Sequence, residues 1–265
     1  MKWSPEAEEA VKKVPFFVRK KVRTRVEQVA AEKGTNRVTL NHVNTAKDRF
    51  LKKMESEVKG YQVDSCFGSG GCPNRANISD TLVKKIEELL RAEDILGFLK
   101  KTVTGSLKFH HEFRVTLSDC PNACSQPQIK DIGIIGADKP EITDETCSVC
   151  EACVSECKEK AIMIHEDAPV INFDLCLACG KCMNVCPTGT IQSGEKGFKI
   201  MIGGKLGRHP ALAKELPGIY SEQELINIVK RCISFYKENS INGERFGSLD
   251  EKTSFYDRLI KMDLK

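Results

Sequence analysis

Twelve of the thirteen cysteines in this 265-residue chain stand at spacings that suit metal ligands. Two runs share one pattern, Cys147-x2-Cys150-x2-Cys153-x3-Cys157 and Cys176-x2-Cys179-x2-Cys182-x3-Cys186, and a looser set comprises Cys66-x5-Cys72 and Cys120-x3-Cys124. A cubane iron–sulfur cluster needs four thiolates around one small volume, and closely spaced cysteines on a turn supply three at little loop-closure cost. Electron transfer is therefore the first hypothesis. Cys232 is left over and is expected to be a buried structural thiol.

The two repeated runs resemble the signature of bacterial two-cluster ferredoxins, in which the fourth cysteine of each run ligates the other cluster. The resemblance implies one cluster on Cys147, Cys150, Cys153 and Cys186, and another on Cys157, Cys176, Cys179 and Cys182. Lys158 follows the first run where Pro187 follows the second. Zinc is the alternative, since Cys-x2-Cys pairs also build zinc sites, but the shared spacing favours iron–sulfur. We expect apolar side chains to shield the clusters, namely Ile162, Ile164, Ile171 and Ile191.

Composition and charge describe the background for this chemistry. A hydrophobic content of 40% and a charged content of 29% are typical of a globular protein. The start of the chain lacks the apolar run of a signal peptide, and no stretch is long enough to span a bilayer, so a reducing, cytoplasmic location with no membrane contact is expected. Residues 1–60 hold 15 Lys/Arg against 8 Asp/Glu, and residues 141–195 hold 3 against 10. A solvated helical face explains the basic end better than nucleic-acid binding, which we do not expect.

The remaining pattern predicts an α+β or α/β architecture. Residues 1–58 read as helices, with Ser4 and Thr39 as capping residues. Further helices are predicted over 79–101, 222–236 and the tail from 244, and strands over 113–117, 129–135 and 197–203. These elements alternate on both sides of the repeated cysteine runs. We therefore predict a helical docking or dimerisation domain over 1–58, one domain built from 59–140 and 196–265, and a ferredoxin insert over 141–195.

The looser cysteine set could be a structural zinc site or a third cluster when taken alone. Its surroundings, SCFGSGGCPNRA (65–76) and SDCPNACSQPQIKDIGIIG (118–136), resemble the two cluster motifs of siroheme-dependent nitrite and sulfite reductases. IGGKLGRHPALAKEL (202–216) and GERF (243–246) also resemble the dissimilatory sulfite reductase branch, where a ferredoxin module interrupts the same domain. The N-terminal WSPEAEEAVKKVPFFVRKKVRTRVE resembles the small helical domain of a light-independent protochlorophyllide reductase subunit.

This resemblance implies a coupled cofactor. A third [4Fe–4S] cluster would be held by Cys66, Cys72, Cys120 and Cys124, and Cys124 would also be the axial ligand of a siroheme iron. Pro121 and Asn122 would shape the loop that presents Cys120 and Cys124, and Gly68, Gly70 and Gly71 would let the backbone approach the cluster. The siroheme carboxylates and the substrate oxygens call for cations. The candidates are Arg75, Arg114, Lys130, Lys205 and Arg208, and His110, His111 and His209 lie in nearby segments of the sequence.

The family places siroheme between two related halves, and residues 1–58 do not resemble the first of them. Either a second copy or a partner subunit completes the pocket, or turnover is poor. The leading hypothesis is a reductase of a small oxyanion, sulfite or nitrite, fed by a low-potential electron donor protein. The alternatives are a three-cluster electron-transfer protein without siroheme and a siroheme-bearing subunit of a larger reductase.

Overall fold

The computed structural model describes residues 1–261, which divide into two compact units. The first unit comprises Met1–Val58 and Thr104–His110, and the second comprises Lys59–Val103 and His111–Lys265. The segment Thr104–His110 therefore belongs with the helical N-terminal unit, whereas the sequence pattern places it in the reductase-like domain. The cysteine-rich insert and the sheet that carries it lie in the same unit.

The first unit consists of three helices and a two-stranded parallel sheet. The helices are α1 (Pro5–Lys12), α2 (Phe16–Glu32) and α3 (Leu40–Glu57), and the strands are β1 (Lys2–Trp3) and β2 (Arg37–Val38). The Ser4 hydroxyl caps α1 by accepting the Ala7 N–H, and Thr39 caps α3 through a capping box with His42, as the sequence predicts. Val26 and Ala30 pack against Ala7 and Val38 in its small core.

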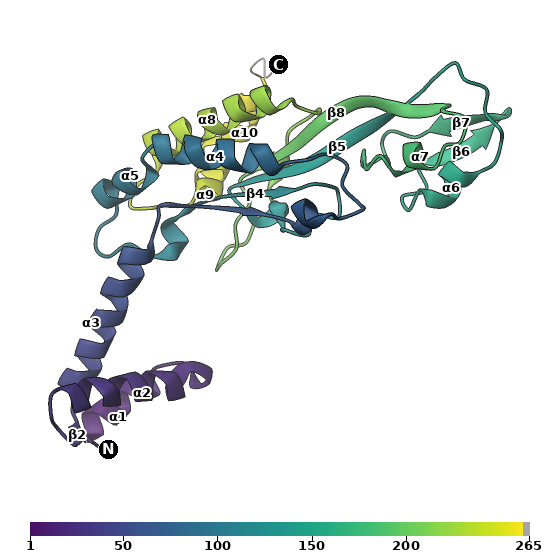
Figure 1. Ribbon diagram of the computed structural model, residues 1–265. Helices are drawn as coiled ribbons and strands as arrows, with labels where there is room; N and C mark the ends of the chain where they lie inside the picture. Colours follow the sequence, from purple (N-terminus) through teal and green to yellow (C-terminus); the bar gives the residue numbers. More distant parts are fainter. Residues whose placement is uncertain (262–265) are drawn as a thin grey trace. The chain divides into compact units, whose positions relative to one another are not determined.

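A five-stranded mixed sheet forms the frame of the second unit (Figure 1). Its order is β3 (Tyr61–Ser65), β4 (Phe113–Ser118), β5 (Ile132–Ile142), β8 (Ile191–Ile202) and β9 (Lys214–Glu215). The first three strands are parallel to one another, and β8 and β9 are each antiparallel to the strand before them. Because β3, β4 and β5 are parallel, their carboxyl ends meet at one edge, which is where ligand sites of open α/β sheets usually form.

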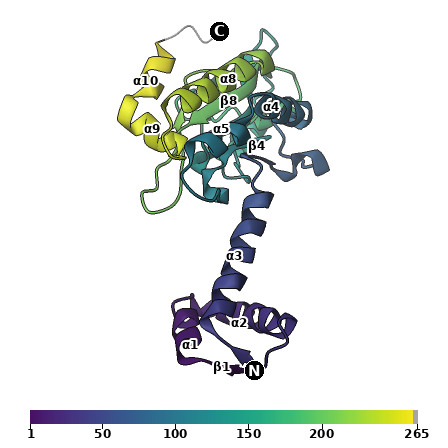
Figure 2. The ribbon, with the colours of Figure 1, turned by 90° about the vertical axis from the view of Figure 1, so that its left-hand side faces the viewer.

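Helices cover one face of this sheet (Figures 1 and 2). They are α4 (Asp80–Ala92), α5 (Ile95–Thr102), α8 (Glu222–Asn239), α9 (Phe246–Thr253) and α10 (Phe255–Ile260). Phe113 on β4 packs with its ring centroid 5.1 Å from Tyr236 of α8 and 5.6 Å from Phe246 of α9. Since alternate residues of a strand face opposite sides, the neighbours of Phe113 on this face are Val115 and Leu117, both fully buried.

The predicted helix over 79–101 is broken in the structure. Asp94 adopts a left-handed conformation with φ 46°, and its carboxylate accepts the Gly97 N–H at 3.1 Å to start α5. Asp at a helix N-cap is favoured because it satisfies a free amide, a signal that the apolar periodicity conceals. Strand β4 agrees with the prediction, whereas β5 and β8 run well beyond the predicted 129–135 and 197–203.

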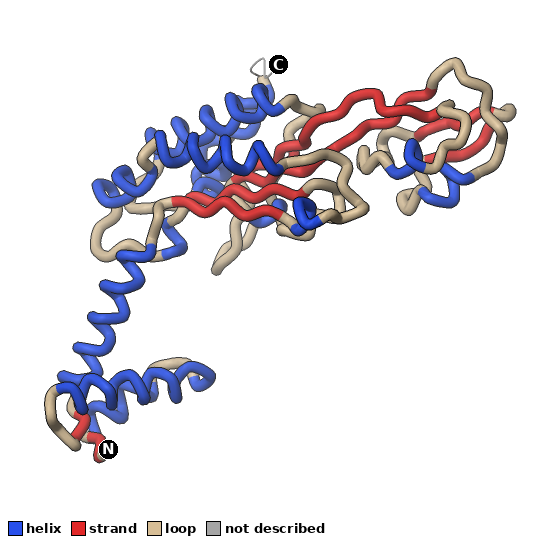
Figure 3. Tube along the Cα trace, in the orientation of Figure 1, coloured by secondary structure: helices blue, strands red, loops and turns tan. Residues whose placement is uncertain are grey.

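The extra length of β5 and β8 forms a two-stranded ribbon that carries the insert (Figure 3). The two strands pair from Ile132↔Ile202 to Ile142↔Ile191, with a register shift between Lys139 and Pro140. At the far end lie α6 (Ala152–Glu156), α7 (Lys181–Asn184) and the hairpin of β6 (Ile162–His165) and β7 (Ala168–Ile171). Short 3-10 helices complete the chain, namely η1 (Phe67–Gly70), η2 (Phe109–His111) and η3 (Pro127–Ile129).

Candidate metal centre

The looser cysteine set lies at the carboxyl ends of two neighbouring parallel strands. Cys66 directly follows β3, and its N–H donates to the Leu117 carbonyl at 2.9 Å, next to the end of β4. Cys120 comes two residues after β4, and a turn with Ala123 at φ 53° leads to Cys124. The Ala123 N–H closes this turn on the Cys120 carbonyl at 3.1 Å.

The other three thiols of this set lie close enough to Cys120 to affect its pKa. Burial raises the pKa of Cys120, and the negative charges of Cys124, Cys66 and Cys72 raise it further. Cys120 is buried, Cys66 and Cys72 are partly buried, and Cys124 is exposed. A cluster held here would therefore have three sheltered ligands and one that faces outward.

Asp119, which the sequence motifs alone do not single out, ties the two halves of this set together. Its N–H donates to the Cys66 sulfur at 3.3 Å, and its carboxylate accepts from the Ser79 hydroxyl at 2.5 Å and from Arg75 Nε at 2.7 Å. A β-carbon on Gly68 would stand 1.9 Å from Asp119 Oδ2. Gly68 is therefore needed because of the Asp119 carboxylate, and the position of Asp119 directly before Cys120 is the sequence signal that would have identified it.

The insert gathers its eight cysteines around two separate cavities. One cavity, of about 10 Å³, is lined by the first three cysteines of the first run together with Cys186, the last of the second. The other, of about 140 Å³, is lined by Cys157 together with Cys176, Cys179 and Cys182. The cavities thus group the cysteines in the same way as the two crossed ligand sets that the ferredoxin resemblance implies. We name them the outer set (Cys147, Cys150, Cys153, Cys186) and the inner set (Cys157, Cys176, Cys179, Cys182).

The two cysteine runs have matching backbone geometry. In the first run Val149 and Glu151 have φ values of 54° and 55°, and in the second Ala178 and Gly180 have φ values of 57° and 73°. These left-handed residues flank the second cysteine of each run and point backbone amides at sulfur. The Val149 N–H donates to Cys147 at 3.3 Å, and the Ala178 N–H donates to Cys176 at 3.5 Å. Hydrogen bonds from backbone N–H groups to cysteine sulfur are a main influence on the reduction potential of an iron–sulfur cluster.

The thiols of the insert differ in pKa because they differ in burial and in hydrogen bonding. Burial raises the pKa of Cys182 to about 12, with a further contribution from Cys179 and Cys176. Burial also raises the pKa of Cys153, whereas the Ala152 N–H and the Ser148 side chain lower the pKa of Cys150. Because metal ligation requires thiolate, cluster assembly must remove the proton from the buried thiols.

Zinc and iron–sulfur clusters both accept sets of four thiolates, so the donor atoms alone do not distinguish them. The repeated x2, x2, x3 spacing and the crossed grouping of the cysteines around the two cavities favour iron–sulfur. In the described part of the chain, no group of three or more His, Cys, Asp or Glu side chains converges to hold a single metal ion.

Isoleucines surround both ligand sets of the insert, as predicted. Ile162, Ile171 and Ile191 are buried together with Cys153 and Cys182, and Ile164 packs against them. This shell excludes water and lowers the local dielectric around the thiolates, which also affects cluster potential. The cavity of the inner set is further lined by Cys120, Pro121 and Asn122. The inner set therefore lies beside the loop that joins the looser set's last two cysteines.

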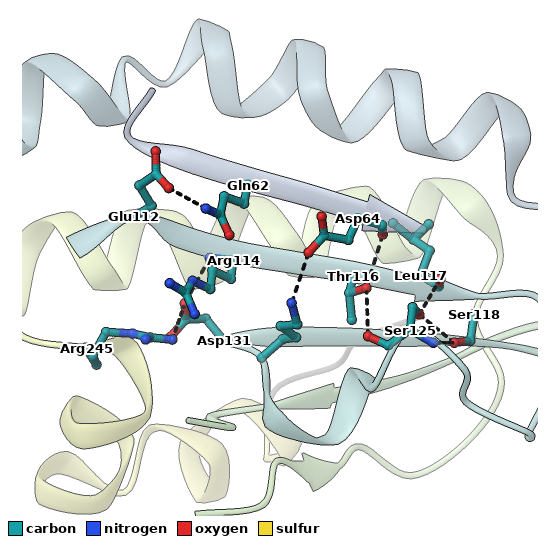
Figure 4. Close-up of polar contacts among 11 residues, drawn as sticks. Gln62, Asp64, Glu112, Arg114, Thr116, Leu117, Ser118, Ser125, Asp131 and Arg245 are labelled. Atoms are coloured by element: carbon teal, nitrogen blue, oxygen red, sulfur yellow. Dashed lines mark hydrogen bonds and ion pairs between the residues drawn. The ribbon is translucent and has the colours of Figure 1, made fainter. Parts of the chain in front are cut away.

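Most of the predicted cationic site residues have acidic partners within the chain. Lys130 Nζ lies 2.9 Å from Asp64, and Lys205 Nζ lies 2.6 Å from Glu251 and 3.0 Å from Ser248 (Figure 4 shows the first pair's surroundings). Arg75 pairs with Asp119 and Asp80. Arg208 and His209 lie on an exposed loop between β8 and β9. His110 and His111 belong to η2, where a β-carbon on Gly243 would contact His111.

A buried ion pair behind Arg114 was not predicted as a functional feature (Figure 4). Asp131 is 1% exposed and accepts from Arg245 Nη2 at 3.0 Å with each carboxylate oxygen, and from the Arg114 N–H at 2.8 Å. Arg245 is the arginine of the GERF segment. The pair ties the residue before α9 to the residue before β5, and the Asp131 carboxylate also holds the backbone of Arg114. A removed partner would leave a buried charge, which typically costs about 3–5 kcal/mol.

Comparison with known proteins agrees with this geometry. The sequence model described as "Nitrite and sulphite reductase 4Fe-4S domain" matches residues 62–256. The chain belongs to this family. A second model, "Proto-chlorophyllide reductase 57 kD subunit", matches residues 3–47 of the helical unit. Both likenesses agree with those that the sequence motifs suggest.

This chain spans less than half the length of the two curated relatives described next. The coenzyme F420-dependent sulfite reductase of Methanocaldococcus jannaschii is 34% identical over 62% of this chain and 25% of that protein. A component of the anaerobic sulfite reductase of Salmonella typhimurium is 28% identical over 51% of this chain and 40% of that protein. The crystal structure of dissimilatory sulfite reductase I (DsrI) has a TM-score of 0.51 at 16% identity, covering 80% of this chain and 56% of that one. That last likeness establishes a shared fold. Among the described residues, no helix is long and apolar enough to cross a membrane.

Proposed function

We propose that this protein is a siroheme- and iron–sulfur-dependent reductase of a small oxyanion, with sulfite favoured over nitrite. Sulfite is favoured because the two curated relatives named above are sulfite reductases. The observation that carries the proposal is that Cys66 and Cys120 lie directly beyond the carboxyl ends of β3 and β4, where the Cys120–Asn122 loop also lines the cavity of the inner cysteine set. Cys72 and Cys124 lie near enough to Cys120 to affect its pKa.

The arrangement supports an order for electron delivery. The inner set shares its cavity with the Cys120–Asn122 loop, whereas the outer set lines a cavity bounded by residues of the insert alone. Electrons from a low-potential donor protein would enter at the outer set, pass to the inner set and reach the looser set. The relay thus uses three [4Fe–4S] clusters, held by the twelve grouped cysteines.

The cysteines of the looser set suit a siroheme site well, whereas the cationic candidates suit it only in part. Exposed Cys124 can present its sulfur to a second metal while it also ligates the cluster together with the three more sheltered thiols. Siroheme, when bound, supplies an iron that binds the sulfur or nitrogen of the oxyanion and accepts electrons. Arg208 is the most accessible candidate for substrate oxygens, while Lys130 and Lys205 would have to exchange carboxylate partners for them.

The pairing of these cations suggests how the pocket is completed. Since Arg75, Lys130 and Lys205 already have acidic partners, siroheme carboxylates call for further cations, which a second copy or a partner subunit would provide. The same pairing favours a second candidate function, a three-cluster electron-transfer subunit without its own turnover. A cytoplasmic location is proposed with both.

An absorption spectrum of anaerobically purified protein separates these functions. The reductase should contain about twelve iron atoms in its clusters and show a haem band in addition to the broad iron–sulfur absorption. Changing Cys124→Ser should abolish the haem band and leave the paramagnetic signals of the two insert clusters. The matched control is Cys232→Ala, because Cys232 is a buried thiol of α8 outside every ligand set.

The outcomes lead to different conclusions. A haem band that survives Cys124→Ser would show that another residue is the axial ligand. A wild-type protein with full cluster content and no haem, after expression with a siroheme supply, would support the electron-transfer subunit. Loss of haem only in Cys124→Ser, together with oxyanion reduction by the wild type, is the expected result.

A further inference from the structure

A buried carboxylate on the ribbon holds the loop of the inner cysteine set. Asp138 of β5 is 6% exposed, and its N–H donates to the Ala178 carbonyl at 2.8 Å. Its backbone also forms a parallel bridge with Cys179. A β-carbon on Gly180 would stand 3.3 Å from Asp138 Cβ, so the loop passes directly over this side chain. The loop that presents Cys179 is therefore fastened to the sheet at Asp138.

The Asp138 carboxylate has its own partners on the opposite strand. Oδ1 accepts from the Ser193 hydroxyl at 2.5 Å, and Oδ2 lies 3.4 Å from Lys196 Nζ. The carboxylate is 9% exposed, whereas the Lys196 side chain is 53% exposed. Solvent thus screens the lysine charge more than the aspartate charge. The net electrostatic effect on the neighbouring loop should be negative.

The cavity of the outer set is also lined by a carboxylate, Glu151, but that residue is exposed to solvent. The backbone bridge, the amide bond and the close approach of Gly180 all concern the inner set. Ala178 also packs with Ala137 and Ile219 in a small buried cluster. The inner loop is consequently tied to the sheet through the backbone of Asp138 and by packing, and it passes beside a buried carboxylate.

We propose that Asp138 is a positioning residue that fixes the inner cluster against the sheet and lowers the reduction potential of that cluster. A cluster gains negative charge on reduction, so a nearby carboxylate makes reduction less favourable, and the effect strengthens where water is excluded. Lys196 opposes it. This inference rests on the proposed function only in assuming that the inner set holds a cluster, because it requires neither siroheme nor turnover.

The test compares the midpoint potential of the inner cluster in variants that each remove one charge of the Asp138–Lys196 pair. Asp138→Asn keeps the shape of the side chain and a hydrogen-bond partner for Ser193 but removes the charge. It should shift the midpoint potential of the inner cluster to a more positive value. Lys196→Met should shift the same potential in the negative direction and by less, because Lys196 is more exposed. Glu141→Gln is the matched control, being a carboxylate on the same strand that is exposed and three residues further along.

Redox titration followed by electron paramagnetic resonance measures these potentials, and loss of a signal in Cys179→Ser identifies the inner cluster. Opposite shifts confined to that signal support the inference. Equal shifts in Asp138→Asn and Glu141→Gln, or no shift in either, would overturn it. Absence of any insert cluster in the wild type would instead refute the proposed function, so the two failures are distinguishable.

Amide hydrogen exchange tests whether Asp138 positions the loop of the inner set. Asp138→Ala removes both the charge and the partner of Ser193, and it should speed exchange of the amides at 138 and 178 without affecting those of α8. Unchanged exchange at both amides would show that packing of Ala178 alone holds the loop.

Discussion

The two cysteine runs of the insert have the same local backbone and different surroundings. Both place left-handed residues before and after their second cysteine, and both direct an amide to their first sulfur. Yet the inner set adjoins the ribbon and the Cys120–Asn122 loop, while the outer set is bounded by residues of the insert. The motif thus determines the local backbone around each cysteine set, and the packing around it determines which set lies beside the Cys120–Asn122 loop.

Replacing one buried cysteine in each set should give the largest difference in activity between the two sets. Cys182→Ser and Cys153→Ser should each lose about four iron atoms per chain, since each breaks one cubane. Cys182→Ser should also abolish oxyanion reduction. Cys153→Ser should retain it with a small dye as the reductant, because the dye can reach the inner cluster directly. Iron analysis and dye-coupled assays check this, and equal activity in the two variants would reverse or remove the proposed order.

The shared core should be the next most sensitive region. Ile191 is 2% exposed and packs with cysteines of both sets, so Ile191→Ala should lower the free energy of unfolding by about 2–5 kcal/mol. Ile142 pairs with Ile191 across the ribbon but is 46% exposed. Ile142→Ala should therefore have a much smaller effect. Anaerobic denaturant titration compares the two, and similar losses would mean that the ribbon end is itself a core.

Relief of backbone strain should change the stability of the protein by a smaller amount, and the change should differ between the two cysteine runs. Val149 is β-branched, has φ 54° and is 40% exposed, so Val149→Gly should stabilise the protein by about 1 kcal/mol. Ala178 has φ 57° but is buried against Ala137 and Ile219. Ala178→Gly should thus be close to neutral, because the loss of a buried methyl, about 0.8 kcal/mol, offsets the relief. Thermal unfolding under anaerobic conditions measures both, and an equal gain would show that strain alone matters.

The smallest effect concerns the ion pair that joins the runs. Lys181 of α7 lies 3.7 Å from Glu156 of α6, with side chains 27% and 38% exposed. Exposed pairs of this kind contribute about 0.2–1 kcal/mol. A double-mutant cycle of Lys181→Gln and Glu156→Gln should give a coupling energy of less than about 0.5 kcal/mol. A larger coupling would mean that this contact, rather than the isoleucine core, holds the halves together.

The sequence allows local chemistry to be predicted better than the contacts between segments. The resemblance of the cysteine runs to two-cluster ferredoxins implies the crossed grouping that lines the two cavities, and β-alternation predicts β4. Both signals come from a few neighbouring residues. The lengths of β5 and β8 were not predicted, since Asp138, Lys139 and Lys196 look like loop residues until pairing between distant strands is known. The roles of Asp119 and Asp138 depend on contacts between residues far apart in the chain.

The cationic candidates show the same limit. Arg75, Lys130 and Lys205 were selected because they lie in matching motifs, and that criterion takes no account of their partners. Their partners Asp64, Asp119 and Glu251 are distant from them in sequence, and only Asp119 lies in one of the matching motifs. A charged residue can be assigned to substrate or cofactor only after its competing partners within the fold are known.

The ribbon of β5 and β8 makes the insert exchangeable. Both strands start as neighbours within the sheet and are still paired at Ile142 and Ile191, where the insert begins and ends. Antiparallel strands at that separation can be closed by a hairpin turn of about two residues. A compact single-domain version of the fold can thus be built by deletion, and other redox modules with closely spaced ends could be grafted at the same point.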